Sequence, residues 1–179
     1  MPDNSTISPS APLIKKMAVL AVVVCTLLPW LQTTHAQAPF PPPNQIQVFN
    51  IRGLDFGSFY PSATGGSVIV DYNGLRTPTG DVVLVGGGIG EPAIFEVVLI
   101  PGRLVSIELQ PSTILSQIGG TGTMTLYIGP SDRGTSFVTT GGHPFRNQVN
   151  VGGTLEVRSP AANPPGNYTG SFTVTFHQN

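Results

Sequence analysis

Apolar and polar residues alternate along much of the chain after residue 45, and the alternation is clearest near the C-terminus. In residues 166–179, Thr, Ser and His occupy one face of an extended chain, and apolar or small residues occupy the other. A period of two in residues that favour strands predicts a half-buried β-strand. A terminal strand that is apolar on one side must pair with a sheet, in its own domain or in a neighbour. The inward face of this predicted strand carries Tyr168, Gly170, Phe172, Val174 and Phe176.

The chain upstream consists of short strand-like segments separated by Gly, Pro and Asn. Asn73-Gly74 is a hairpin turn signal, because both residues tolerate positive φ. Residues 114–118 could form one short helical turn, and no longer amphipathic helix is indicated. The pattern predicts an all-β, antiparallel immunoglobulin-like sandwich of about 7–9 short strands. The strand-like segments are 46–51, followed by 54–57; 67–72, followed by a return from 75 toward 80; and 81–85, 93–100, 104–109, 123–128, 148–157 and the C-terminal segment, which makes about eight strands.

A Gly-Gly-Ser/Thr-apolar-x-Val pattern occurs at residues 65–70 and again at residues 152–157. We interpret the pattern as a turn that leads into a strand, used twice within one domain. It is not a solenoid repeat, because it occurs only twice and at no fixed short period.

The N-terminal residues predict export. Lys15 and Lys16 precede an apolar run at 17–31, and small residues follow it, which is typical of a signal peptide. We expect a leader over residues 1–36 with cleavage after Ala36. The run is shorter than the ~20 residues that span a bilayer, so no membrane insertion is expected after cleavage. The protein would then be periplasmic, cell-surface or extracellular.

Residues 37–44 contain four prolines and predict an extended polyproline-II linker. Residues 45–179 are then expected to form a single β-sandwich domain.

Composition narrows the possible functions. Charged residues are only 9% of the chain, with 22 Gly and 18 Pro, which is typical of a turn-rich exported β domain. A formal net charge of −1 and scattered arginines argue against nucleic acid or another polyanion as a partner. The only cysteine, Cys25, and both lysines lie in the predicted leader, so thiol and lysine Schiff-base chemistry are excluded from the mature chain.

Two loops resemble ligand-binding motifs only superficially. Gly88-x-Gly90-x-x-Ala93 formally fits a dinucleotide fingerprint, which requires a following helix. Residues 94–100 are rich in strand-forming types and end at Pro101, so a hairpin loop is expected. Residues 71–74 lack the further oxygen ligands of a calcium loop.

No catalytic, cofactor-binding or metal-ligating residue is predicted, and the protein is expected not to be an enzyme. His143 lies in a Gly-rich loop, and His177 lies on the polar face of the last predicted strand. Neither has the spacing of a nucleophile elbow or of a zinc site, and both are interpreted as solvated. Carboxylates such as Asp55 and Asp71 are interpreted as residues of strand-end turns.

Several motifs resemble the domain of unknown function 4402 family, whose members are exported, pilin-like bacterial proteins. The resemblance covers most of residues 46–179 and implies a fold more than an activity. The motifs that carry it are Leu54-x-Phe56-Gly57, Gly66-Ser-Val68-x-Val70, Gly74-x-Arg76, Gly80, Val151-Gly-Gly-Thr-Leu-x-Val157 and Gly166-x-Tyr168-x-Gly170-x-Phe172-x-Val174.

The C-terminal segment is also similar to chaperone–usher fimbrial subunits, in which a glycine at the place of Gly166 precedes alternating apolar residues. That resemblance implies a periplasmic chaperone or a second copy as a partner, bound by β-strand addition. The chain departs from the pattern at Gln178, where those subunits have tyrosine. Its proline-rich linker also cannot donate to a β-ladder, so completion of the sheet by the chain itself is an open alternative.

The leading hypothesis is therefore a non-enzymatic, exported structural or adhesion-type surface protein. Its predicted assembly edge consists of Gly166 and the five inward residues of the last strand. A soluble module that binds carbohydrate or a small ligand is an alternative from another class, with Phe59-Tyr60 and Tyr127 as candidate platforms. A third alternative is a small outer-membrane β-barrel, although most predicted strands are shorter than the ~9–11 residues that such barrels use.

Overall fold

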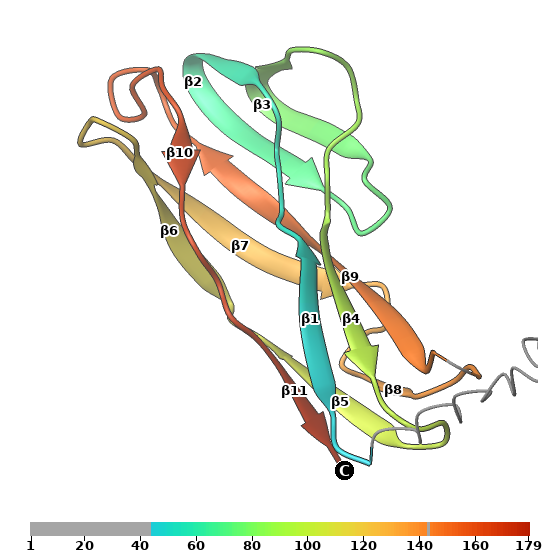
Figure 1. Ribbon diagram of the computed structural model, residues 1–179. Coiled ribbons are helices and arrows are strands. Elements are labelled where there is room, and N and C mark those ends of the chain that lie inside the picture. Colours follow the sequence, from blue (N-terminus) through green and yellow to red (C-terminus); the bar gives the residue numbers. More distant parts are fainter. Residues whose placement is uncertain (1–43, 143) are drawn as a thin grey trace, which may run out of the picture. The chain divides into compact units, whose positions relative to one another are not determined.

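The computed structural model describes residues 44–142 and 144–179, and these residues form an all-β fold without a helix. Their strands lie in two antiparallel sheets (Figure 1). The strands are β1 (Gln47–Arg52), β2 (Phe59–Val70), β3 (Arg76–Leu84), β4 (Ala93–Val98), β5 (Leu104–Leu109), β6 (Ser112–Gln117), β7 (Thr123–Ser131), β8 (Ser136–Val138), β9 (Arg146–Val157), β10 (Tyr168–Thr169) and β11 (Val174–Gln178).

The large sheet is organised around β9, the long orange strand of Figure 1. β7 pairs along one side of β9. Two strands share the other side: β4 pairs with residues 146–151 and β2 pairs with residues 153–157. β1 pairs with β4, β3 with β2, and β6 and β10 follow β7. β1 and β10 are therefore the outer strands of the path that runs through β9.

The small sheet, in the order β11-β5-β8, shares a hydrophobic core with β4 and the first half of β9. Phe95, Val97, Val105, Val149 and Phe176 are buried members of this core. The ring centroids of Phe95 and Phe176 lie 5.8 Å apart, and the two ring planes are inclined by 57°. Aromatic pairs favour this arrangement. Each such buried side chain contributes roughly 1.5–3 kcal/mol relative to exposure. The two sheets therefore form a sandwich around this core.

A second core lies within the curled large sheet. It consists of residues from β2, β3, β7 and β9, covered by Phe56 of the β1–β2 connection. These strands are neighbours in one sheet, so the sheet curls around the side chains that they share. The buried members are Phe56, Val68, Val70, Val82, Met124, Leu126, Leu155 and Val157.

The predicted fold class is confirmed, because the described residues form an antiparallel, two-sheet β fold. The number of strands exceeds the predicted 7–9. One reason is that residues 114–118 do not form a helical turn: they belong largely to β6, which pairs with β7. β8 is a further strand, of only 3 residues, too short for alternation to reveal.

The C-terminal segment is also not one continuous strand. β10 pairs with β6 in the large sheet, whereas β11 pairs with β5 in the small sheet. Residues 170–173 lie between β10 and β11. They change sheet beside Gln110-Pro111, where the paired segment passes from β5 to β6. Pro111 and the change of sheet together interrupt the ladder of backbone hydrogen bonds. The alternation of side chains nevertheless continues through the break.

The two Gly-Gly patterns do not begin with a turn, so that part of the prediction is wrong, whereas the strand expected after each Gly-Gly is present. Residues 65–70 lie inside β2 and residues 152–157 lie inside β9. The two segments pair with each other, from Gly66 opposite Val157 to Val70 opposite Gly153. The repeated pattern therefore reflects two halves of one antiparallel pair.

The glycines of these patterns permit close contact where the large sheet bends. A Cβ atom on Gly66 would lie 1.9 Å from the Thr79 carbonyl oxygen, and one on Gly152 would lie 2.5 Å from the Val70 carbonyl oxygen. Both distances are far below van der Waals contact, and backbone oxygens cannot move aside as a flexible side chain can.

The predicted leader and all of the linker except Asn44 lie outside the described residues, as does His143. None of the described residues forms a helix that is long and apolar enough to cross a membrane.

We expect Gly66→Ala to lower the free energy of unfolding by about 1–3 kcal/mol, the usual cost of overpacking. Gly53→Ala is the matched control, because a Cβ there meets nothing within 4 Å, and its expected effect is within about 0.5 kcal/mol. Urea denaturation of both variants measures the difference. Equal stabilities would contradict the close contact between β2 and β3.

Candidate functional site

A groove of about 780 Å³ opens between the first and last parts of the described chain. One bank is formed by residues 52–61, which lead from β1 into β2, and the other by residues 163–172, which contain β10. The floor belongs to the sandwich interior and includes Phe95, Leu115, Met124, Leu126 and Leu155. The groove therefore lies between two segments that are far apart in sequence, above core side chains that are themselves almost fully buried.

The C-terminal bank belongs to a ribbon that joins the two sheets. Tyr168 lies opposite Gln117 in the large sheet, and Gln178 lies opposite Val105 in the small sheet. Between them, the Gln110 N–H donates to the Thr173 carbonyl at 3.1 Å, and the Thr173 N–H donates to the Gln110 side chain at 2.9 Å. The segment from Tyr168 to Gln178 therefore follows residues 105–117 along its whole length.

The other edge of this segment is open. Among the described strands β10 pairs only with β6, and β11 pairs only with β5. In an antiparallel strand, the backbone N–H and C=O groups of alternate residues point toward the paired strand and away from it. The backbone of Thr173 bonds to Gln110, and the backbone of Asn179 bonds to Leu104. Val174, Phe176 and Gln178 therefore direct their backbone N–H and C=O groups away from β5.

The opposite bank begins with β1, a second outer strand. β1 pairs only with β4 among the described strands, and almost all of it is exposed. Val48 faces the same side as the buried Val97, its partner on β4, yet 43% of Val48 is exposed. The core side of β1 is therefore not fully covered. The segment that precedes β1 contacts β11, because the Gln178 side chain donates to the Asn44 carbonyl at 3.3 Å; the start of β1 and the end of β11 lie at the same end of the fold (Figure 1).

Buried polar residues fix the C-terminal bank. Asn163 is only 4% exposed; its Nδ2 donates to the Thr123 carbonyl, and its Oδ1 accepts from the Arg158 N–H. The Tyr168 hydroxyl donates to the Pro164 carbonyl at 2.6 Å. Burial raises the pKa of the Tyr168 phenol above its ordinary value near 10.0. The loop before β10 is therefore held in one conformation.

Arg76 holds the other bank. It is 5% exposed, and its guanidinium donates to the carbonyls of Ser58, at 2.6 Å, and Val85, at 3.2 Å. Its Nε has no hydrogen-bond partner among the described residues. These bonds tie the β1–β2 connection to the segment after β3, so the guanidinium positions backbone and is not presented to a ligand.

The structure places the six predicted edge residues in two groups. Gly166, Tyr168, Gly170 and Phe172 line the groove. Val174 and Phe176 lie beyond it in β11 and pack in the core between the sheets. Gly170 contacts β6 closely, since a Cβ there would lie 2.9 Å from the Ile114 carbonyl oxygen.

Sequence reasoning missed the β1 side of the groove. The only signal was that apolar residues occur on both faces of the segment, as Val48 on one face and Phe49 and Ile51 on the other. Apolar residues on both faces are typical of a strand that is buried on both faces. In the structure, however, these three side chains are 43–54% exposed.

The carboxylates and loops with possible chemistry have local structural roles. Asp55 accepts from the Gly57 N–H, and Asp71 accepts from the N–H groups of Asn73 and Leu75. The segment after β3 leads directly into β4, although it is not the expected hairpin, because β3 and β4 do not pair. His177 is exposed, with its Nε2 3.5 Å from a Glu108 carboxylate oxygen. Across residues 44–142 and 144–179 no three His, Cys, Asp or Glu side chains are grouped as metal ligands.

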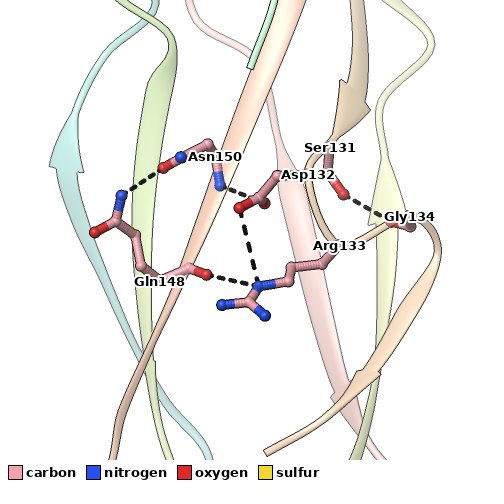
Figure 2. Close-up of polar contacts among 6 residues, drawn as sticks. All are labelled: Ser131, Asp132, Arg133, Gly134, Gln148 and Asn150. Carbon is pink, nitrogen blue, oxygen red and sulfur yellow. Dashed lines mark hydrogen bonds and ion pairs between the residues drawn. The ribbon is translucent and has the colours of Figure 1, made fainter. Parts of the chain in front are cut away.

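A polar cluster holds the β7–β8 turn against β9 (Figure 2). The Asp132 carboxylate accepts from the Asn150 N–H at 2.8 Å, and Arg133 Nε donates to the Gln148 carbonyl at 3.1 Å. Ser131 closes the turn by donating to the Gly134 carbonyl at 2.7 Å. These polar groups form their hydrogen bonds with one another and with the backbone. The cluster therefore positions the turn beside the point where the β7–β9 register shifts.

Comparison with protein families gives one match. A family model described as Domain of unknown function (DUF4402) matches residues 46–177. The chain belongs to this family. The match includes all the described strands except the last residue of β11, so the DUF4402 domain contains both banks of the groove. No curated protein and no solved structure matches the chain.

We expect Tyr168→Phe to lower the stability of the DUF4402 domain by about 1 kcal/mol at pH 8, the usual net value of one hydrogen bond. Because the folded pKa is raised, the contribution of Tyr168 is present below the unfolded value near 10.0 and is lost as pH rises through the folded value. Urea denaturation at pH 8 and pH 11 should therefore show a smaller difference between the wild type and Tyr168→Phe at pH 11. A difference that does not change with pH would contradict the assignment.

Proposed function

We propose that this protein is a non-enzymatic, exported structural or adhesion-type surface protein that takes up an additional β-strand at its C-terminal edge. The strand would come from a second copy of the chain or from a periplasmic chaperone. The observation that carries the proposal is the open edge of β10 and β11, whose β10 end borders a groove with apolar residues in its floor. Unpaired backbone groups at a sheet edge are a template for pairing with another chain.

The chemistry of the groove supports strand addition over catalysis. Its floor is apolar, and the best-buried polar groups of its banks, on Asn163 and Tyr168, bond to backbone of the same chain. An added strand could place alternate side chains above the floor where its backbone pairs with β10, and could continue along the open edge of β11. The predicted signal peptide supports export to the periplasm, the cell surface or the medium.

Removal of two outward-directed N–H groups tests strand addition. Val174→Pro/Gln178→Pro lacks both donors but keeps the N–H groups of Thr175 and His177, which alternation directs toward β5. Val174→Ala/Gln178→Ala is the matched control, because it truncates the same side chains and keeps both donors. Circular dichroism first establishes that both variants fold.

We expect the wild type, exported through its own leader and purified from periplasm, to form concentration-dependent oligomers or to co-purify with a chaperone. The proline variant should remain a monomer, whereas the alanine variant should associate. Size-exclusion chromatography with light scattering distinguishes these results. A wild-type protein that stays monomeric without a partner at every concentration would contradict the proposal, and so would association of the proline variant.

A further inference from the structure

The outer face of the large sheet carries a second feature, which is independent of the groove. Tyr127 of β7 is 49% exposed there, while its neighbours Leu126 and Met124 point into the core. The strand register places Ser112 and Thr154 directly on either side of Tyr127. An exposed aromatic ring is thus flanked by hydroxyl side chains on adjacent strands.

Five neighbouring strands, β6, β7, β9, β2 and β3, form this face (Figure 1). Side chains on these strands lie in two rows across the face, and most of them carry hydroxyl groups. Directly opposed residues of antiparallel strands point to the same side of a sheet, so each row is one line of side chains. The first row is Ser112, Tyr127, Thr154, Ile69 and Thr77, and the second is Ile114, Thr125, Glu156, Ser67 and Thr79.

The face has almost no net charge. Its one ionised side chain, Glu156, pairs with Arg158 at 3.1 Å. A phosphate, a nucleic acid or an acidic polysaccharide would find no unpaired cation in these rows. Complementarity of charge therefore favours an uncharged partner.

Hydroxyl groups at one end of the rows are free to bind. Ser67 and Thr79 bond to each other with oxygens 2.6 Å apart. By contrast, the side-chain hydroxyls of Ser112, Thr125, Tyr127 and Thr154 have no hydrogen-bond partner within the described part of the chain. Each serine or threonine hydroxyl can both donate and accept, which suits the hydroxyls of a sugar. The tyrosine ring offers an apolar face with a polar tip, which suits the C–H face of a pyranose ring.

The shape of the face favours a polymer over a single sugar. The rows lie on a sheet surface and not in the groove, whose lining includes none of their ten residues. Side chains along a row repeat at the strand spacing of about 4.8 Å, close to the length of one pyranose unit. A linear chain that lies across the strands could therefore meet a new side chain with each sugar.

We propose that this hydroxyl face, centred on Tyr127, binds a linear, uncharged polysaccharide. The ring of Tyr127 stacks against one sugar, and the hydroxyls of Ser112, Thr125 and Thr154 bond to its neighbours. This activity does not depend on strand addition at the groove, and the two surfaces can be tested separately.

The test uses native affinity electrophoresis of the exported full chain in gels that contain a neutral β-glucan, a neutral mannan or anionic alginate. We expect retardation by at least one neutral polymer and none by alginate. Tyr127→Ala should weaken binding about tenfold or more, as expected for a central aromatic contact, and Tyr127→Phe should retain most of it. Tyr60→Ala is the matched control, because Tyr60 is similarly exposed, at 55%, but lines the groove.

Thr125→Val/Thr154→Val is a second variant that keeps strand-forming side chains and removes two hydroxyls, and it should also lose binding. It decides the question if Tyr127→Ala fails to fold by thermal melting. No retardation by either neutral polymer would overturn the proposal. Retardation by alginate alone, or loss of binding in Tyr60→Ala with none in Tyr127→Ala, would also overturn it.

Discussion

A single antiparallel ribbon joins the two sheets, and the C-terminal strand of this ribbon has an open edge. Residues 105–117 and Tyr168–Gln178 change sheet together, so one face of each strand packs in the interior throughout. The inner strand of the ribbon is paired on both sides where β6 meets β7 and β5 meets β8. The C-terminal strand is paired on one side only. Unpaired backbone groups at such an edge are a template for pairing with another strand, which is the basis of the proposed function.

Three polar residues hold the two banks of the groove in place. Arg76 ties the β1–β2 connection to the end of β3, and Asn163 and Tyr168 tie the loop before β10 to β7 and to itself. A groove whose banks are fixed by buried hydrogen bonds does not have to be ordered by its occupant. Such preorganisation lowers the cost of binding an extended segment.

Side-chain alternation was sufficient to predict the fold class and the apolar face of the C-terminal segment. It could not locate the break at residues 170–173, because a strand that changes sheet keeps its alternation while its pairing partner changes. The short apolar run at 114–118 was ambiguous between helix and strand, and only pairing with β7 decides it. The Gly-Gly patterns were mistaken for turns because glycine permits a tight turn and a close approach of strands equally well. The β1 bank could not be predicted, since exposure of Val48 depends on what the rest of the fold leaves uncovered.

Hydrogen exchange at single amides of the isolated monomer tests the open edge most directly. If β11 is paired only with β5, the amides of Thr175 and His177 are protected, whereas those of Val174 and Gln178 exchange quickly. This alternation should disappear when the protein assembles or binds a partner strand. Equal protection of all four amides in the monomer would mean that the sheet is already complete, and would contradict the account.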